Sequence, residues 1–225
     1  MKAIIPFKKE EAKSRLADFL GEREREELAI RMLKDVLVAL SESEIEEAEI
    51  ISTCSEEEIT EDARLWLDSD LKQKLKLTVR EDGRGLNEVL NEVIKEEKSP
   101  LLIIMADIPL ATPESINEII THEEDVVIAP GRKGGTNALF LRRPYEVSVS
   151  YYGISCLEHI ETAKRRSLSY AVHDSFFISA DMDEIEDLME LLIHGRGFSA
   201  GYLRGIGVHL RVDKNSKMRA KVDRF

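Results

Sequence analysis

Cysteine is scarce in this chain of 225 residues, which contains only Cys54 and Cys156. Neither lies in a CxxC pair, so a structural zinc site has little support. A single disulfide between them stays open as an alternative, but two thiols in a chain of this length fit a reducing compartment better. We therefore expect a cytoplasmic protein whose stability comes from an apolar core, since 43% of its residues are hydrophobic.

Long apolar runs and a signal sequence are also missing. No run approaches the roughly 18–20 apolar residues that a membrane-spanning helix needs. The first residues, MKAIIPFKKEEAK, lack the apolar core and the small-residue cleavage site of a signal peptide. These two absences argue against a membrane protein and against a secreted one.

Positive charge is in deficit, because 32 Lys and Arg residues face 44 Asp and Glu residues, for a formal net charge of −12. A chain this acidic is a poor candidate for binding nucleic acid or an anionic membrane. Residues 41–62 hold ten acidic residues and no Lys or Arg, which we interpret as a solvated face. An anionic ligand would therefore need a local cluster of cations.

The loop after the first predicted strand lacks glycine, so it is neither a Walker A loop nor a GxGxxG dinucleotide fingerprint. P-loop hydrolases and dinucleotide-dependent dehydrogenases therefore have little support. The loop instead carries the cations Lys8, Lys9, Lys13 and Arg15. Because ligands of open α/β sheets bind beyond the carboxyl ends of the strands, these cations are candidates for contacting phosphate oxygens. Surface lysines in a solvated loop are the alternative interpretation.

Short apolar runs alternate with segments of helical periodicity along most of the chain. The predicted strands are residues 2–5, 48–52, 75–79, 101–105, 126–129, 138–141 and 176–179. The predicted helices are residues 22–40, 56–67, 86–97, a helix that starts at 112–114, 154–164 and 185–193. Repeated strand–helix units predict a single α/β domain with a mainly parallel, mixed sheet and helices on both faces.

The last thirty or so residues differ in composition from the rest. Five of the 12 glycines fall within residues 195–207, and residues 211–225 contain six basic and two acidic side chains. We divide the chain into a domain over 1–194 and a glycine-rich basic extension over 195–225. The extension is interpreted either as a solvated tail or as a segment packed on the domain or on a second subunit, which leaves a homodimer open.

Three aspartates follow predicted strands. Asp107 comes almost directly after the buried run 101–105, where a carboxylate suits Mg²⁺, although a turn aspartate before a proline is equally plausible. Asp181 and Asp183 follow the predicted strand at 176–179. Asp183 fits a helix cap with Glu186 three residues later, and Asp181 is freer to face a ligand. A metal site would combine Asp107 with one of this pair.

Three loops combine glycines with hydroxyl or amide side chains just before predicted helices or strands. Such loops let a backbone approach a ligand closely and present N–H groups to anions, although ordinary loops are the alternative. His159 lies one turn after the last of them and is interpreted as packed or surface-exposed rather than catalytic. The candidate residues in these loops are Gly83, Gly85, Leu86, Asn87, Thr136, Gly153 and Ser155.

Six segments occur in the order and spacing of one known family: IPFKKEEAKSRL, EDGRGLNEVL, MADIPL, PGRKGGTNAL, YYGISCLEH and SADMDEIEDL. On these segments the chain resembles the 2-phospho-L-lactate guanylyltransferases, from Met1 to about His194. The resemblance implies a single-domain, GT-A-like nucleotidyltransferase fold of the kind that makes nucleotide sugars. It also implies transfer of GMP from GTP to the phosphate of 2-phospho-L-lactate, giving lactyl-2-diphospho-5'-guanosine and pyrophosphate during synthesis of the deazaflavin coenzyme F-420.

The resemblance also implies roles for individual residues. Lys8, Lys13 and Arg15 match the triphosphate-binding segment and, with Asp107, are the expected catalytic residues. Asp107, Asp181 and Asp183 match the acidic positions expected to bind Mg²⁺. The positions near guanine and ribose are Gly83, Gly85, Leu86 and Asn87, and those that hold the acceptor acid are Thr136, Gly153 and Ser155.

Other functions stay open on the sequence. The nearest alternative is a nucleotidyltransferase of the same fold that uses phosphoenolpyruvate, 3-phosphoglycerate, a molybdenum cofactor or a sugar phosphate. A more remote one is a nucleotide-binding module without catalysis. Such a module would bind GTP without needing Asp107 and would release no pyrophosphate.

Overall fold

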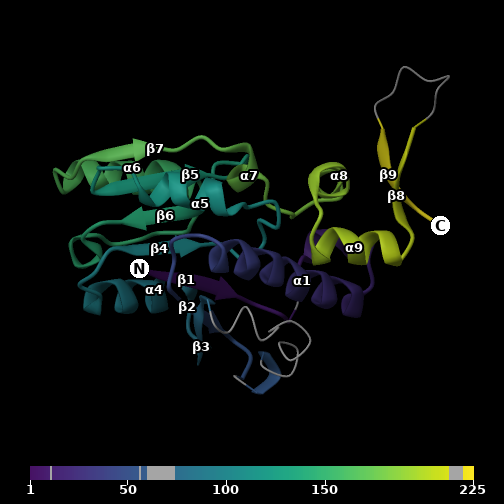
Figure 1. The fold of residues 1–225 in the computed structure, drawn as a ribbon, viewed down its shortest axis with the longest axis horizontal. Coiled ribbons are helices and arrows are strands. Elements are labelled where there is room, and N and C mark those ends of the chain that lie inside the picture. The colour runs from purple at the N-terminus through teal and green to yellow at the C-terminus, as the bar shows by residue number, and fades with distance from the viewer. Residues whose placement is uncertain (11, 56, 60–73, 213–219) are drawn as a thin grey trace.

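The computed structural model describes residues 1–10, 12–55, 57–59, 74–212 and 220–225. Among them, seven strands form one sheet in the order β3-β2-β1-β4-β6-β5-β7 (Figure 1). β6 is antiparallel to β4 and β5, and the other neighbours are parallel, which confirms the predicted mixed, mainly parallel sheet. The strands are β1 (Lys2–Phe7), β2 (Glu47–Ser52), β3 (Lys76–Glu81), β4 (Leu101–Ile104), β5 (Val126–Pro130), β6 (Thr136–Leu141) and β7 (Tyr170–Val172).

Helices cover both faces of this sheet, as the sequence predicts. Within β4, Leu102 and Ile104 join one apolar core, while Leu101 and Ile103 join the other. This alternation explains why the strand is apolar at every position: it is buried on both sides. The first core also takes residues of α1 (Glu22–Ser41), α5 (Pro113–Ile120), α8 (Asp187–His194) and α9 (Phe198–Gly205), and the second takes residues of α4 (Leu86–Glu96) and α6 (Ser155–Arg165).

The helix predicted to start at residues 112–114 is confirmed together with its cap. The Ser115 N–H donates to Oγ1 of Thr112 across 3.2 Å, and Pro113 occupies the first helical position. The helix predicted over residues 56–67 lies largely outside the described residues. No helix of the described ranges is long and apolar enough to cross a bilayer. Cys54 and Cys156 are both buried and free.

The prediction of a strand at residues 176–179 is wrong, because these residues form the short helix α7 (Phe176–Ser179). In a strand, Phe176 and Ile178 would share one face. Instead 40% of Phe176 is exposed and Ile178 is fully buried, while the Ser179 N–H donates to the Ser175 carbonyl across 2.8 Å. The edge strand of the sheet next to β5 is instead β7, which the sequence pattern did not predict.

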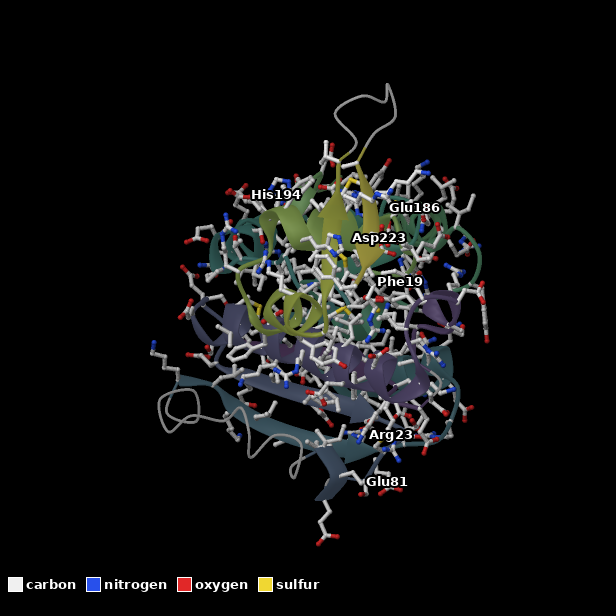
Figure 2. All side chains as sticks on the ribbon, turned by 90° about the vertical axis from the view of Figure 1, so that its right-hand side faces the viewer. Phe19, Arg23, Glu81, Glu186, His194 and Asp223 are labelled. Carbon is white, nitrogen blue, oxygen red and sulfur yellow. The ribbon has the colours of Figure 1, made fainter. Side chains whose placement is uncertain are left out.

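The described part of residues 195–225 packs on the rest of the chain. Ala200 and Leu203 of α9 are fully buried in the first core. The strands β8 (Val208–Arg211) and β9 (Lys221–Arg224) form an antiparallel hairpin that projects beyond α9, with Asp223 on its second strand (Figures 1 and 2). Arg224 forms an ion pair of 2.5 Å with Glu24 of α1.

Asp35 of α1 is the main polar anchor of α9. Its Oδ1 accepts a 2.6 Å hydrogen bond from the Phe198 N–H, and its Oδ2 accepts one of 3.0 Å from the Ser199 N–H. The Ser199 hydroxyl also donates to this carboxylate. Asp35 therefore caps the N-terminus of a helix that begins far away in the sequence.

Candidate active site

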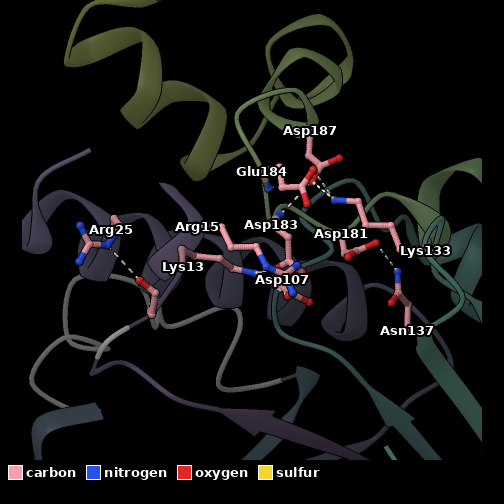
Figure 3. Close-up of polar contacts among 11 residues, drawn as sticks. Lys13, Arg15, Arg25, Asp107, Lys133, Asn137, Asp181, Asp183, Glu184 and Asp187 are labelled. Carbon is pink, nitrogen blue, oxygen red and sulfur yellow. Dashed lines mark hydrogen bonds and ion pairs between the residues drawn. The ribbon is translucent and has the colours of Figure 1, made fainter. Parts of the chain in front are cut away.

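Charged side chains meet beyond the carboxyl ends of β1 and β4 (Figure 3). Nζ of Lys13 lies 2.6 Å from Oδ2 of Asp107 and 2.9 Å from Oδ1 of Asp183. Arg15 reaches the other oxygen of Asp183 across 3.1 Å. Lys13 adopts a left-handed backbone conformation, with φ of 54°, just before the 3-10 turn η1 (Ser14–Leu16). The structure thus brings together four of the predicted site residues.

The buried ammonium of Lys13 is held by charge. Burial alone would lower the pKa of Lys13, but the negative charges of Asp107 and Asp183 outweigh burial and raise this pKa above its usual value. For Asp183 the balance is the reverse: burial alone would raise its pKa, but Lys13 and Arg15 hold it below the usual value. Lys13 is therefore charged and Asp183 ionised at neutral pH.

Asp181 lies beside this cluster without an ion pair among the described residues. Its Oδ1 accepts a hydrogen bond of 3.3 Å from Asn137 (Figure 3). Burial, and then the negative charge of Asp107, raise the pKa of Asp181 above its usual value. The site therefore contains the carboxyl groups of three aspartates, Asp107, Asp181 and Asp183. Among the described residues, Lys13 and Arg15 form ion pairs with two of them, Asp107 and Asp183.

The interpretation of Asp183 as a helix cap is wrong. The helix α8 begins at Asp187, and Oδ2 of Asp187 accepts the N–H groups of Asp183 and Glu184 across 3.1 and 2.8 Å. The carboxylate of Asp183 is thereby left to bind Lys13 and Arg15. Nζ of Lys133 also approaches Asp187, at 3.2 Å from the same Oδ2 (Figure 3).

The carboxylate oxygens of these aspartates are chemically suited to bind a divalent metal ion, but their present arrangement does not form a metal site. Carboxylate oxygens are the ligands that Mg²⁺ prefers, and the excess negative charge near Asp181 favours a cation. As they stand, no three acidic, histidine or cysteine side chains of the described ranges converge closely enough to hold a metal. Nζ of Lys13 occupies the space between Asp107 and Asp183, so a metal held by both would require Lys13 to move.

Two neighbouring cavities open at the end of β1 and share Pro6, Phe7, Lys8 and Met105 as a common wall. One, of about 290 Å³, reaches Lys13 and Asp107. The other, of about 360 Å³, extends to β2 and to Leu86 at the start of α4. Lys8 thus lies between the charged cluster of Lys13 and Asp107 and the larger, mostly apolar cavity.

The predicted nucleotide loop borders the larger cavity. A side chain added at Gly83 or Gly85 would meet nothing within 4 Å, so the backbone there is open to a ligand. Leu86 lines the cavity with 40% of its surface exposed. Asn87 has a different contact, because its Oδ1 accepts the N–H of Tyr151 across 2.7 Å.

Two of the three predicted acceptor residues, Thr136 and Ser155, lie beside His159. Oγ of Ser155 lies 3.1 Å from Oγ1 of Thr136, and Nδ1 of His159 lies 2.9 Å from the same oxygen. All three residues are buried. Gly153, exposed and with φ of 57°, lies in the loop that leads to Ser155. His159 is packed, as the sequence interpretation expects, but its contact with Thr136 was not predicted; its position four residues after Ser155, on the same face of a helix, was the available signal.

Comparison with known proteins agrees with this geometry. A family model described as "Guanylyl transferase CofC like" matches residues 1–225. The chain belongs to this family. The 2-phospho-L-lactate guanylyltransferase of Methanosarcina mazei is 44% identical over 205 residues, which cover 90% of this chain and 91% of that protein. The protein of the same name from a Methanocaldococcus species is 36% identical and spans 100% of this chain and 96% of its own length.

Solved structures share the fold of this chain. A protein from Desulfovibrio desulfuricans G20, described as a nucleotide-diphospho-sugar transferase, matches with a TM-score of 0.71 and 18% identity over 91% of this chain and 94% of its own. A nucleotidyl transferase from Methanothermobacter matches with a TM-score of 0.61 and 11% identity, over 91% and 98% of the two chains. The predicted nucleotidyltransferase fold is therefore confirmed.

Proposed function

We propose that this CofC-like protein is a guanylyltransferase that transfers GMP from GTP to the phosphate of 2-phospho-L-lactate. The observation that carries the proposal is the cluster of Lys13, Arg15, Asp107 and Asp183 beside two cavities at the carboxyl edge of the sheet, in a chain of this family. Relatives that are 36–44% identical over most of the chain bear the name of this activity.

The proposed reaction is an in-line displacement at phosphorus. An oxygen of the acceptor phosphate forms a bond to the α-phosphorus of GTP, the bond from that phosphorus to the bridging oxygen breaks, and pyrophosphate leaves with the electron pair. A phosphate monoester is already largely ionised at pH 7, because its second pKa is about 6, so no strong general base is required. The protein has to align two polyanions and neutralise their charge.

Each part of the site has a place in this scheme. Lys8, Lys13 and Arg15 neutralise the triphosphate, and the larger cavity near Gly83, Gly85 and Leu86 takes the nucleoside. The acceptor lies toward Thr136, Gly153 and Ser155. A bound Mg²⁺ would supply charge neutralisation at the phosphates, held by Asp107 with Asp181 or Asp183.

Release of pyrophosphate tests this proposal. The protein is assayed with Mg²⁺, each of the four common nucleoside triphosphates, and a panel of 2-phospho-L-lactate, phosphoenolpyruvate, 3-phosphoglycerate and a sugar phosphate. We expect the highest kcat/KM for GTP with 2-phospho-L-lactate. A preference for another acid or for a sugar phosphate would overturn the acceptor assignment, and GTP binding without pyrophosphate release would overturn the enzyme assignment.

A further inference from the structure

His159 is buried, and both of its ring nitrogens have partners. The backbone N–H of Ser150 donates to Nε2 across 3.2 Å, and Nδ1 lies 2.9 Å from Oγ1 of Thr136. An amide N–H can only donate, so Nε2 must offer a lone pair. Burial lowers the pKa of His159 to about 4, so the ring is neutral at pH 7 and carries its single proton on Nδ1.

This tautomer sets the direction of the next hydrogen bonds. Nδ1–H donates to Oγ1 of Thr136, and that oxygen lies 3.1 Å from Oγ of Ser155. Thr136 and Ser155 have one hydroxyl hydrogen each. One of these hydrogens forms the hydrogen bond between Oγ1 of Thr136 and Oγ of Ser155, so the other is free to be donated to an acceptor outside the three residues. In the described part of the chain it has no further protein acceptor, and only 3% of each of these two residues is exposed. A hydroxyl in such a position favours an incoming oxygen that can only accept.

The same ring also helps to hold the loop that leads to Gly153. Three successive amides of this loop donate to side chains instead of to the backbone: the N–H of Val149 to Oδ1 of Asn91 at 2.9 Å, that of Ser150 to His159, and that of Tyr151 to Oδ1 of Asn87 at 2.7 Å. The loop is therefore tied both to α4, which borders the nucleotide cavity, and to α6. His159 is the link that also reaches the two hydroxyls.

We propose that His159 is a positioning residue for the acceptor acid: by donating to Thr136 it makes the Thr136–Ser155 pair a hydrogen-bond donor to one anionic oxygen of the substrate. This inference rests on the proposed function, which places the acceptor at these hydroxyls. His159 does not touch the acid and acts only through Thr136. An acceptor with a neutral oxygen at that point would gain less from the arrangement, because hydrogen bonds to charged groups are the stronger ones.

Two substitutions of His159 by residues with a side-chain amide distinguish its hydrogen bond to Thr136 from its hydrogen bond to Ser150. In His159→Asn the amide nitrogen takes roughly the place of Nδ1 and can still donate to Thr136. In His159→Gln the amide oxygen takes roughly the place of Nε2 and can still accept from Ser150, but the donor to Thr136 is lost. Both variants are first checked for folding by circular dichroism and thermal unfolding.

We expect His159→Gln to raise the KM for the preferred phospho-acid about tenfold, the effect of one lost hydrogen bond to a charged group, with the KM for GTP within about twofold of the wild type. His159→Asn should keep an acceptor KM close to that of the wild type. Equal losses in both variants, or an unchanged acceptor KM in His159→Gln, would show that the ring only packs or holds the loop.

The tautomer can be measured in the free wild-type protein without any assay of activity. Long-range ¹H–¹⁵N correlation spectra of the histidine rings, assigned by substituting each of the other four histidines in turn, should show Nδ1 of His159 protonated and Nε2 bare at pH 7. A proton on Nε2 would overturn the inference even if both variants failed to fold. Wild-type protein that shows this tautomer but turns over no phospho-acid would instead overturn the proposed function, and with it the role of His159 in binding the acid.

Discussion

Replacing Lys13 with methionine removes the ammonium between Asp107 and Asp183 and shortens the side chain by only one atom. Breaking a buried ion pair costs about 3–5 kcal/mol. The side chains of Asp107 and Asp183 keep 30% and 33% exposure, so water screens the charges that remain. We therefore expect a loss of about 1–3 kcal/mol, which for a chain of this length lowers the melting temperature by about 2–12 °C.

Mg²⁺ should restore much of this loss, because the variant frees the space between the two carboxylates. A ligand present at about a hundred times its dissociation constant stabilises the folded state by about 2.7 kcal/mol. Thermal unfolding is therefore followed with MgCl₂ and with NaCl at equal ionic strength. We expect a larger rise in melting temperature with Mg²⁺ for Lys13→Met than for the wild type, in which Lys13 would compete with the metal.

Lys133→Met is the matched control. Lys133 also pairs with two carboxylates, those of Glu184 at 3.1 Å and Asp187 at 3.2 Å. Oδ2 of Asp187 remains bound to two backbone N–H groups in this variant, so it is a poor metal ligand. We expect no added effect of Mg²⁺ in the control. An identical Mg²⁺ shift in Lys13→Met and in the wild type would refute competition between Lys13 and the metal.

Three further predictions concern Asp107, Asp35 and Asp183. Asp107→Asn should lower Mg²⁺-dependent turnover at least about a hundredfold, by analogy with the loss of one preorganised charge-stabilising donor, while the protein stays folded by circular dichroism; a fully active variant would contradict the metal assignment. Asp35→Ala should cost about 1–2 kcal/mol in urea unfolding because α9 loses its cap, whereas Asp35→Asn should cost less, and equal losses would argue against the cap. The pKa of Asp183 is below its unfolded value of about 3.9, so its contribution to stability is complete above that pH and is lost as the pH falls through the lowered pKa. Urea unfolding at pH 5 and pH 3 should therefore show a smaller loss on acidification in Lys13→Met than in the wild type.

The sequence was sufficient to predict a strand of the sheet wherever that strand is buried on both faces. The run at β4 is apolar because each of its side chains meets one core or the other, so composition alone reveals it. The residues at Phe176–Ser179 show the limit, because three apolar residues followed by a serine fit one helical turn as well as a short strand. Only packing against the rest of the chain decides between the two.

The sequence predicted most of the residues that form the candidate site, but it did not predict which of their side chains contact one another. Asp107 and Asp183 could be grouped because each follows an apolar run that predicts a strand, although the second run, at residues 176–179, is the helix α7. That Lys13 would bridge them depends on a left-handed turn at a non-glycine residue, which local sequence does not indicate. The cap at Asp187 and the hydrogen bonds of His159 depend equally on which loops meet in space.

The bond between Asp35 and the start of α9 joins residues that are 163 positions apart, and this separation bears on how the protein is made. On a ribosome the first helix emerges early, but the residues that cover it are synthesised almost last. Its packed form must therefore wait until translation nears completion, and the loop of Lys13 beside it lacks its partner Asp183 for nearly as long. An unfinished chain would leave the side of α1 that packs against α9 exposed to chaperones and proteases.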